Sequence, residues 1–416
     1  MMDGAMADES FDADVVVLGG GPAGNNAALE LSRRGHRVVV VDRRRDLGDK
    51  LCTGIVSAEC VKSFPAEPAH VRRAARSAMV FSPLGSTIHI ERPEPQAYIL
   101  DRAAYVASFA KRAQAAGATY LLEHTVEAIS IDRDGVTVTA CPPLSISDGE
   151  GARRAGEART LRARAAIVAC GFGSRVPAMT GLEEPKDYVT GAQVEVLAPN
   201  VPEVEVYVGR SYAPGFFAWT APTSEGRALV GLMARRQAGE LLDQLVARLK
   251  TEGKVTEATR APRKWGIPLK PIARTYRDRV VAVGDAAGQV KPATGGGIYY
   301  SLLASRMAAE TLDEALRKDD LSAKALSGYE CSWKAVMRDD MEVAYAARRM
   351  LDTLSDSQVD YLIRKLGNSE AAQRLWESPS LSFDWHGRFF KTMVKTPVMR
   401  GAFRALDVVL PKGVTR

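Results

Sequence analysis

Short apolar runs rich in β-branched residues recur in the first part of the chain and again near residue 280. The first two, 14–18 and 38–41, flank a stretch with helical spacing. Such runs are typical of strands buried in a parallel sheet. A third strand is predicted at 161–169 and a fourth at 280–283, which leads into a long helix from about 297 to 316. This order predicts an α/β domain that begins with a βαβ unit.

The middle of the chain has a different pattern. Residues 77–90 alternate around a Pro-Leu-Gly turn signal, and residues 126–140 predict a hairpin that turns at Asp-Gly. Segment 142–160 is polar and glycine-rich, which predicts a loop. Residues 176–268 hold several strand-like runs and one helical stretch, so they predict a sheet-based insertion. From 321 onward the pattern is helical.

The composition fits a folded protein and excludes a disordered or fibrous chain, because 46% of the residues are hydrophobic and 25% are charged. No apolar run approaches the roughly 18 residues of a membrane-spanning helix. The acidic opening residues lack the features of a secretory signal, so we expect a cytoplasmic protein. Five scattered cysteines without metal-ligand spacing predict neither a disulfide framework nor a metal site.

The net charge of +6 is concentrated in the tail, 383–416, where seven basic residues face two acidic ones. The remainder is nearly neutral, so a nucleic-acid surface is not expected. Apolar residues follow Pro397 at helical spacing, with Arg400 and Arg404 among them. Such a helix either rests on an anionic membrane, as a peripheral contact, or packs on its own domain with a solvated basic face.

The sequence Gly-Gly-Gly-Pro-Ala-Gly follows the first strand at residues 19–24. In this motif Gly19 serves the tight turn, Gly21 the close approach of a diphosphate, and Gly24 the packing of helix on sheet. The next strand ends at Asp42, whose carboxylate can accept hydrogen bonds from a ribose diol. The expected cofactor contacts here are Gly19, Gly21, Pro22, Ala23, Gly24, Asp42 and Arg43.

A second motif separates FAD from NAD. After the strand at 280–283, Gly284 and Asp285 place a carboxylate near a polyol chain, and the glycines at 295–297 open a helix whose N–H groups can face a flavin ring edge. A nicotinamide cofactor needs no such second cradle, whereas FAD extends between the two. The contacts expected at this end are Gly284, Asp285, Pro292, Gly295, Gly296 and Gly297.

Taken together, GGGPAG and GDAAGQVKPATGGGIYYSL closely resemble the geranylgeranyl reductase family, a branch of the p-hydroxybenzoate hydroxylase-like flavoproteins. Residues 48–54, with Cys52 and Gly54, resemble the family's cysteine-containing loop. Residues 98–102, which end on Arg102, resemble its Asp–Arg segment. The resemblance covers roughly residues 12–320. It implies FAD as the cofactor, reduction of isolated double bonds in prenyl chains, and cofactor contacts at Gly54 and Arg102.

The order of the predicted elements also indicates the domain organisation. We expect an α/β fold in which a Rossmann-like FAD-binding domain carries an inserted antiparallel-sheet substrate domain and a helical C-terminal segment. The expected FAD-binding domain is discontinuous and comprises 12–76, 98–175 and 270–320. The substrate domain comprises 77–97 and 176–269, and the helical segment 321–416.

Two departures from the family pattern bear on the reaction. The wider superfamily has an Asp–Gly motif after its third strand, and Cys170 stands at the matching place. The electron donor is therefore left open between NAD(P)H and a ferredoxin-like carrier. The family's Tyr-x-Trp-x-Phe-Pro motif is Phe217-Ala-Trp219-Thr-Ala-Pro222 here. The same segment also resembles the Trp-x-Trp-x-Ile-Pro motif of flavin-dependent halogenases.

Reduction of an isolated alkene requires a hydride on one carbon, a proton on the other, and a dry apolar site. Cys52 is the candidate proton donor, although a free cysteine is often a plain buried residue. The candidate wall of the pocket comprises Phe216, Phe217, Trp219, Tyr299 and Tyr300, with core packing as the alternative for each.

Three functions compete at this stage. The first is a reductase of prenyl chains on a lipid or a quinone. The second is an oxygen-using monooxygenase or halogenase, and the third is a non-catalytic flavin protein. Two cofactor cradles and an aromatic-rich insertion disfavour the third, and the family resemblance favours the reductase.

Overall fold

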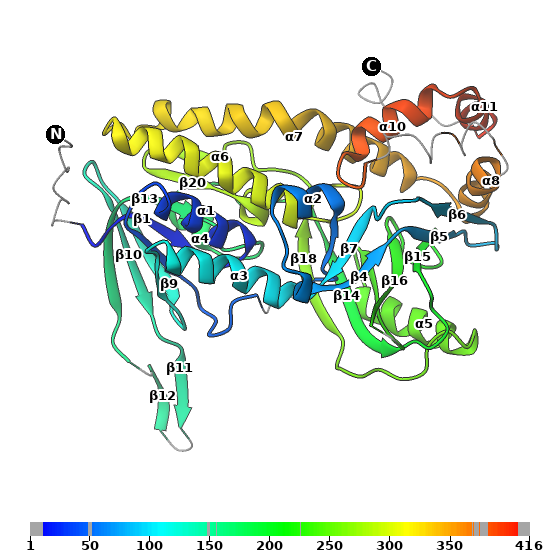
Figure 1. Ribbon diagram of the computed structural model, residues 1–416, viewed down its shortest axis with the longest axis horizontal. Coiled ribbons are helices and arrows are strands. Elements are labelled where there is room, and N and C mark those ends of the chain that lie inside the picture. Colours follow the sequence, from blue (N-terminus) through cyan, green and yellow to red (C-terminus); the bar gives the residue numbers. More distant parts are fainter. Residues whose placement is uncertain are drawn as a thin grey trace.

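A computed structural model describes residues 11–48, 52–147, 150–154, 156–224, 226–367, 369, 374 and 382–406. Its strands form two large sheets beside each other, with a long helix running over both (Figure 1). A small three-stranded sheet and a two-stranded hairpin complete the β structure of this part of the chain.

The first large sheet carries the nucleotide-binding unit. Its main strands follow the order β19-β20-β13-β1-β2-β8, and the β9–β10 hairpin joins it by pairing with β13. The four central pairings, from β20 to β8, are parallel. The bounds are β1 Ala13–Leu18, β2 Val38–Val41, β8 Thr119–Leu121, β9 Thr125–Ile131, β10 Val136–Cys141, β13 Arg159–Val168, β19 Tyr276–Arg277 and β20 Val280–Ala282.

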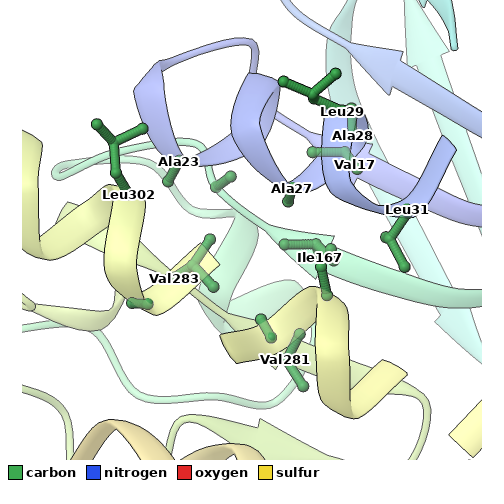
Figure 2. Close-up of a cluster of buried hydrophobic side chains, with 14 of the residues drawn as sticks. Val17, Ala23, Ala27, Ala28, Leu29, Leu31, Ile167, Val281, Val283 and Leu302 are labelled. Atoms are coloured by element: carbon green, nitrogen blue, oxygen red, sulfur yellow. The ribbon is translucent and has the colours of Figure 1, made fainter. Parts of the chain in front are cut away.

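The central strands are apolar throughout because both of their faces are buried. Val15 and Val17 of β1 face helices α1 (Pro22–Ser32), α3 (Arg102–Ala115) and α6 (Ile298–Arg317). Val16 and Leu18 face the β9–β10 side instead. Figure 2 shows α1 seated on the sheet by its alanines and leucines, next to Leu302 of α6.

The second large sheet has the order β18-β14-β17-β16-β15-β5-β6 and is antiparallel except for the β15–β5 pair. Helix α5 (Ala238–Thr251) covers one face through an apolar cluster. The opposite face carries Trp219, Met233 and Ile267 in a separate cluster. The strands are β5 Ser77–Phe81, β6 Thr87–Glu91, β14 Tyr188–Leu197, β15 Val204–Val208, β16 Phe217–Ser224, β17 Arg227–Ala234 and β18 Arg263–Pro268.

The remaining elements connect and cover the two sheets. Strands β3 (Ile55–Ser57), β4 (Val71–Ala75) and β7 (Ala97–Leu100) form the small sheet, with α2 (Ala58–Ser63) beside it. Helix α7 (Ala323–Leu351) runs along the molecule to the C-terminal helices (Figure 1). Those helices are α8 Asp356–Gly367, α10 His386–Lys395 and α11 Pro397–Ala405, and α4 is the short helix Val176–Met179.

The observed fold confirms the predicted fold class, and one local prediction is wrong. Segment 142–160 was expected to be a loop, but it contains the paired strands β11 (Leu144–Ser147) and β12 (Glu150–Arg154). Mutual pairing satisfies backbone groups even where the sequence is polar, and hydropathy gives no signal of it. The division into the three expected domains stays a prediction. No helix in the described ranges combines the length and apolarity needed to cross a membrane.

Candidate active site

The turn between β1 and α1 requires glycine at two positions, Gly19 and Gly24. Gly19 has φ +117°, and a Cβ on Gly24 would lie 1.8 Å from the Gly19 carbonyl oxygen. A Cβ on Gly21, the N-cap of α1, would meet nothing within 4 Å. The turn is therefore tight inside and open outside, where the N-terminus of α1 offers backbone N–H groups to a diphosphate.

Asp42 ends β2 beside this turn. Its Oδ2 accepts a hydrogen bond from the Gly20 N–H at 2.7 Å, and its Oδ1 accepts one from the Arg44 N–H at 2.8 Å. These bonds fix the carboxylate at the edge of a groove that Arg43 also lines. A carboxylate oxygen has two lone pairs, so each can still accept a ribose hydroxyl.

The second cradle lies at the other end of the same groove. Asp285 follows β20, and a Cβ on Gly297 would lie 2.8 Å from its Oδ1. Gly297 is the N-cap of α6, so the carboxylate sits against the N-terminus of that helix. The groove includes Gly19, Asp42, Arg102, Asp285, Gly295 and Gly297 in its lining.

This arrangement fits FAD. An open glycine turn at one end, a ribose-binding carboxylate beside it and a glycine-rich helix start at the other end lie along one groove. Gly19, Gly21, Pro22, Ala23, Asp42 and Arg43 line the first part, and Asp285, Gly295 and Gly297 line the second. Gly24 and Gly284 are buried beside the turns, while Pro292 and Gly296 belong to the loop that leads into α6.

Cys52 lies where the groove meets a second cavity, and it lines both. Its Sγ accepts a hydrogen bond from the Gly54 N–H at 3.4 Å. The neighbouring Thr53 hydroxyl donates to Oε1 of Gln193 on β14 at 2.7 Å. These contacts tie the cysteine to the second sheet. Asp49, Lys50 and Leu51 of the expected cysteine loop lie outside the described residues.

Arg102 is held at the same junction. Asp101 caps α3 by accepting from the Ala104 N–H, which fixes the backbone at the start of the helix. The buried Arg102 guanidinium donates to the Gly48 carbonyl at 2.6 Å and lines both cavities. A Cβ on Gly54 would lie 2.6 Å from the Leu100 carbonyl oxygen and 3.5 Å from the Arg102 Cβ, so Gly54 permits this close packing.

Two tryptophans of the second sheet pack over glycines of neighbouring strands. A Cβ on Gly231 would lie 2.4 Å from the Trp219 ring, and one on Gly191 would lie 2.7 Å from the Trp265 ring. Each indole therefore lies flat over a glycine of the neighbouring strand, β17 or β14. Trp265 and Ile267 line the same groove, which is called the flavin groove from here on because its lining fits FAD. Neither residue was predicted from the sequence. The only available signal was the alternation of β18.

Phe217 lines a third, strongly apolar cavity. This cavity lies between the end of the second sheet and the C-terminal helices, and Ala293 lines it from the loop before α6. Its apolar lining includes Phe216, Leu351, Leu354, Val359, Leu362, Ile363, Leu366, Phe389, Phe390, Met393, Met399 and Phe403. This cavity could not be predicted from the sequence because its wall is assembled from distant segments.

Tyr299 and Tyr300 point elsewhere. The Tyr299 hydroxyl donates to Glu59 Oε1 at 3.0 Å, and the Tyr300 hydroxyl donates to Asp340 Oδ2 at 3.1 Å. Both rings pack against Trp385 in the core of the first domain. Burial and the nearby carboxylates raise the pKa of both phenols. This placement gives no support to the expectation that they wall the substrate pocket.

Comparison with known proteins agrees with FAD as the cofactor. A family model described as an FAD binding domain matches residues 12–339. The digeranylgeranylglycerophospholipid reductase of Methanocaldococcus jannaschii is 30% identical over 370 residues, covering 86% of this chain and 91% of that one. Reductase 2 of the same name from Methanothermobacter thermautotrophicus is 33% identical, covering 85% and 91%.

A solved geranylgeranyl bacteriochlorophyll reductase-like protein from Thermoplasma acidophilum has the same fold. Its TM-score is 0.82 at 21% identity, and the alignment covers 95% of this chain and 99% of that one. The p-nitrophenol 4-monooxygenase of Pseudomonas putida aligns with a TM-score of 0.69 at 19% identity, over 87% and 95%. The protein is thus an FAD-dependent oxidoreductase, as predicted, and it belongs to the geranylgeranyl reductase family.

Proposed function

We propose that this enzyme reduces isolated carbon–carbon double bonds in the prenyl chains of a lipid. The observation that carries this proposal is the apolar cavity next to the flavin groove. Ala293 lines the cavity, and Gly295, two residues further along the same loop, lines the groove. An apolar chain lying in the cavity therefore needs to extend only past this loop to reach the cofactor.

The cavity suits a prenyl chain because each methylene-sized group that is moved from water into an apolar site contributes about 0.8 kcal/mol of favourable free energy. Three of the described residues that line the cavity are charged, and Arg210 donates to the backbone carbonyls of Asp352 and Thr353. Arg348 donates to Asp352 Oδ2 at 2.9 Å and stacks on the Phe216 ring. This pair and the aromatic rings leave a dry surface for the chain, which excludes water from the reacting bond.

Bound reduced FAD supplies the hydride for one alkene carbon. We assign the proton for the other carbon to the Cys52 thiol, which lies at the inner end of the groove beside the second sheet. The S–H bond breaks as the new C–H bond forms, and the negative charge left on sulfur is stabilised by the Gly54 N–H. Together the hydride and the proton add two hydrogens per double bond.

Access to lipid also belongs to the proposal. In α11, Met399, Ala402 and Phe403 pack inward, whereas Arg400 and Arg404 are exposed. The apolar face of the tail helix is thus used within the protein, and the basic face is what remains for an anionic membrane surface. Residues 407–416 of the tail lie outside the described residues. The electron donor is proposed to be NAD(P)H or a ferredoxin-like carrier, and a prenyl quinone is the alternative substrate.

Mass spectrometry under strict anaerobiosis tests the reaction. The dithionite-reduced holoenzyme is incubated with a digeranylgeranyl lipid, and we expect a gain of two hydrogens for each reduced bond. A heteroatom added only after air is admitted would instead identify a monooxygenase or halogenase, and would overturn the proposal.

A further inference from the structure

A second cavity lies on the far side of Cys52 from the flavin groove. It is formed by the start of α3, strand β14 and the segment before β18, and it shares Gly48, Cys52 and Arg102 with the groove. Four arginines line it, namely Arg72, Arg102, Arg260 and Arg263. Of these, only Arg102 also lines the flavin groove, so the other three are not needed to hold FAD.

The cavity carries an excess of positive charge. Its two carboxylates, Asp101 and Glu195, are already bound within the protein. Asp101 accepts from Arg72 at 2.8 Å and from the Ala104 N–H, and these bonds lower the pKa of Asp101.

Glu195 Oε2 lies 3.3 Å from Arg260 Nε and also accepts from the Thr259 hydroxyl at 3.1 Å. The described lining therefore holds four guanidinium groups and only two carboxylates. Because both carboxylates are already bonded to protein groups, they do not indicate a cation site.

Neutral hydrogen-bonding groups complete the lining. Thr223, on β16, is 2% exposed, and its hydroxyl has no hydrogen-bond partner among the described residues. Gln193, on β14, is 3% exposed and accepts from Thr53. A buried hydroxyl without a partner is costly in the free protein, so its place in a polar cavity points to a ligand that would satisfy it.

We propose that this cavity binds the phosphate group of a small anionic reactant and thereby places the reactant beside Cys52 and the flavin. Guanidinium groups bind phosphate through paired, charge-assisted hydrogen bonds, and the Thr223 hydroxyl adds a neutral donor. The glycine turn of 19–24, which would receive the diphosphate of FAD, is not part of the lining of this cavity.

Two reactants of this enzyme can carry such a group. One is the headgroup of a prenyl phospholipid, whose chain would pass Cys52 toward the apolar cavity. The other is the diphosphate of a nicotinamide nucleotide. The first case rests on the proposed function and selects a phospholipid over a quinone as the substrate.

The test uses the holoenzyme, the double variant Arg260→Gln/Arg263→Gln, and Arg236→Gln as a control, because Arg236 is exposed on the same domain outside the cavity. Digeranylgeranylglycerophospholipid is compared with digeranylgeranylglycerol, which has the same chains without phosphate. The KM for NADPH is measured separately through flavin reduction. Inorganic pyrophosphate is titrated against flavin fluorescence as a direct probe.

For a headgroup site, the ratio of kcat/KM for the phospholipid to that for the uncharged lipid falls at least about tenfold in the double variant, since charge-assisted bonds are lost. For a nucleotide site, the KM for NADPH rises by a similar factor while that ratio stays constant. In both cases pyrophosphate binds the wild type saturably and the double variant more weakly. Arg260→Gln alone, at an exposed position, replaces the double variant if the latter misfolds.

One contrary outcome is that the double variant shows the same kcat/KM ratio of the two lipids and the same KM for NADPH as Arg236→Gln, with no binding of pyrophosphate. In that case the proposed phosphate site is wrong, even if both lipids are reduced. If neither lipid is reduced by the wild type, the proposed function fails. The NADPH and pyrophosphate measurements then still decide on the phosphate site.

Discussion

Lys291 Nζ lies 2.8 Å from Asp384 Oδ1, and both side chains are almost completely buried. Lys291 begins the loop that leads to the N-terminus of α6, where the flavin ring is expected, and it also accepts backbone hydrogen bonds from Gly295 and Thr294 through its carbonyl. Asp384 belongs to the segment before α10. This one ion pair therefore fastens the C-terminal segment to the cofactor loop.

Breaking this pair is expected to destabilise the protein strongly. Lys291→Met leaves the Asp384 carboxylate buried without its charge partner, which typically costs about 3–5 kcal/mol. Urea unfolding of the holoenzyme measures the loss, and Lys291→Met/Asp384→Asn should recover part of it. Lys318→Met removes an exposed pair with Glu314 and should cost less than about 1 kcal/mol. Equal losses for the buried and exposed pairs would contradict this account.

Cys52→Ser is expected to lower kcat at least about 100-fold while the flavin spectrum stays normal, because a hydroxyl is a far weaker acid than a thiol and general acids contribute roughly 10²–10⁴-fold. Steady-state reduction of a geranylgeranyl lipid under anaerobiosis gives the rate. Cys331→Ser, at an exposed position, is the matched control. Undiminished turnover in Cys52→Ser would remove the thiol from the mechanism.

Ala293→Leu is expected to narrow the passage between the apolar cavity and the flavin groove. Ala293 lines the cavity, and Gly295 of the same loop lines the groove. The kcat/KM for a geranylgeranyl chain should fall about tenfold, equivalent to about 1.4 kcal/mol, and that for a single isoprene unit should fall less. Ala247→Leu, exposed on α5, controls for the added side chain. A uniform loss for all chain lengths would show that the cavity does not hold the chain.

Acidification is expected to weaken the fold through His386. Burial, and then the positive charge of Lys291, lowers the pKa of this imidazole to about 3. The unfolded chain binds a proton near pH 6.5 and the folded protein does not, so stability is lost as the pH falls below about 6.5.

Between pH 7 and 5 we expect a loss of about 1–2 kcal/mol from this group. His386→Gln should reduce the pH dependence of the free energy of unfolding by that amount, as measured by urea titrations at each pH. An identical pH dependence in the variant would refute the assignment.

Gly24→Ala is expected to yield protein with little bound flavin. The added Cβ would lie 1.8 Å from the Gly19 carbonyl oxygen, so the turn that receives the diphosphate must open. Overpacking of about 1–3 kcal/mol, if it falls on the FAD-bound form, corresponds to a loss of FAD affinity of roughly 5- to 150-fold. The ratio of flavin to protein absorbance measures it. Gly401→Ala, where a Cβ meets nothing within 4 Å, should keep its flavin.

Local patterns in the sequence were sufficient for the cofactor half of the molecule. A strand that is buried on both faces must be apolar throughout, so β1, β2 and β20 were evident as apolar runs. Gly19 and Gly24 were evident because a turn this tight has no room for a Cβ at these two positions. These constraints act between residues close in sequence, which is why the family and FAD could be predicted from motifs and are confirmed by the relatives.

Only the tertiary structure decided what surrounds the cofactor. The apolar cavity draws its wall from segments between Val208 and Phe403, and the arginine-lined cavity draws its wall from segments between Gly48 and Arg263. Tyr299 and Tyr300 come shortly after the glycines of 295–297, yet their positions on α6 turn them into the core. The sequence determined which residues are apolar, charged or free of a Cβ. Which of them face one another depends on how distant elements pack, and that packing is not encoded in any local pattern.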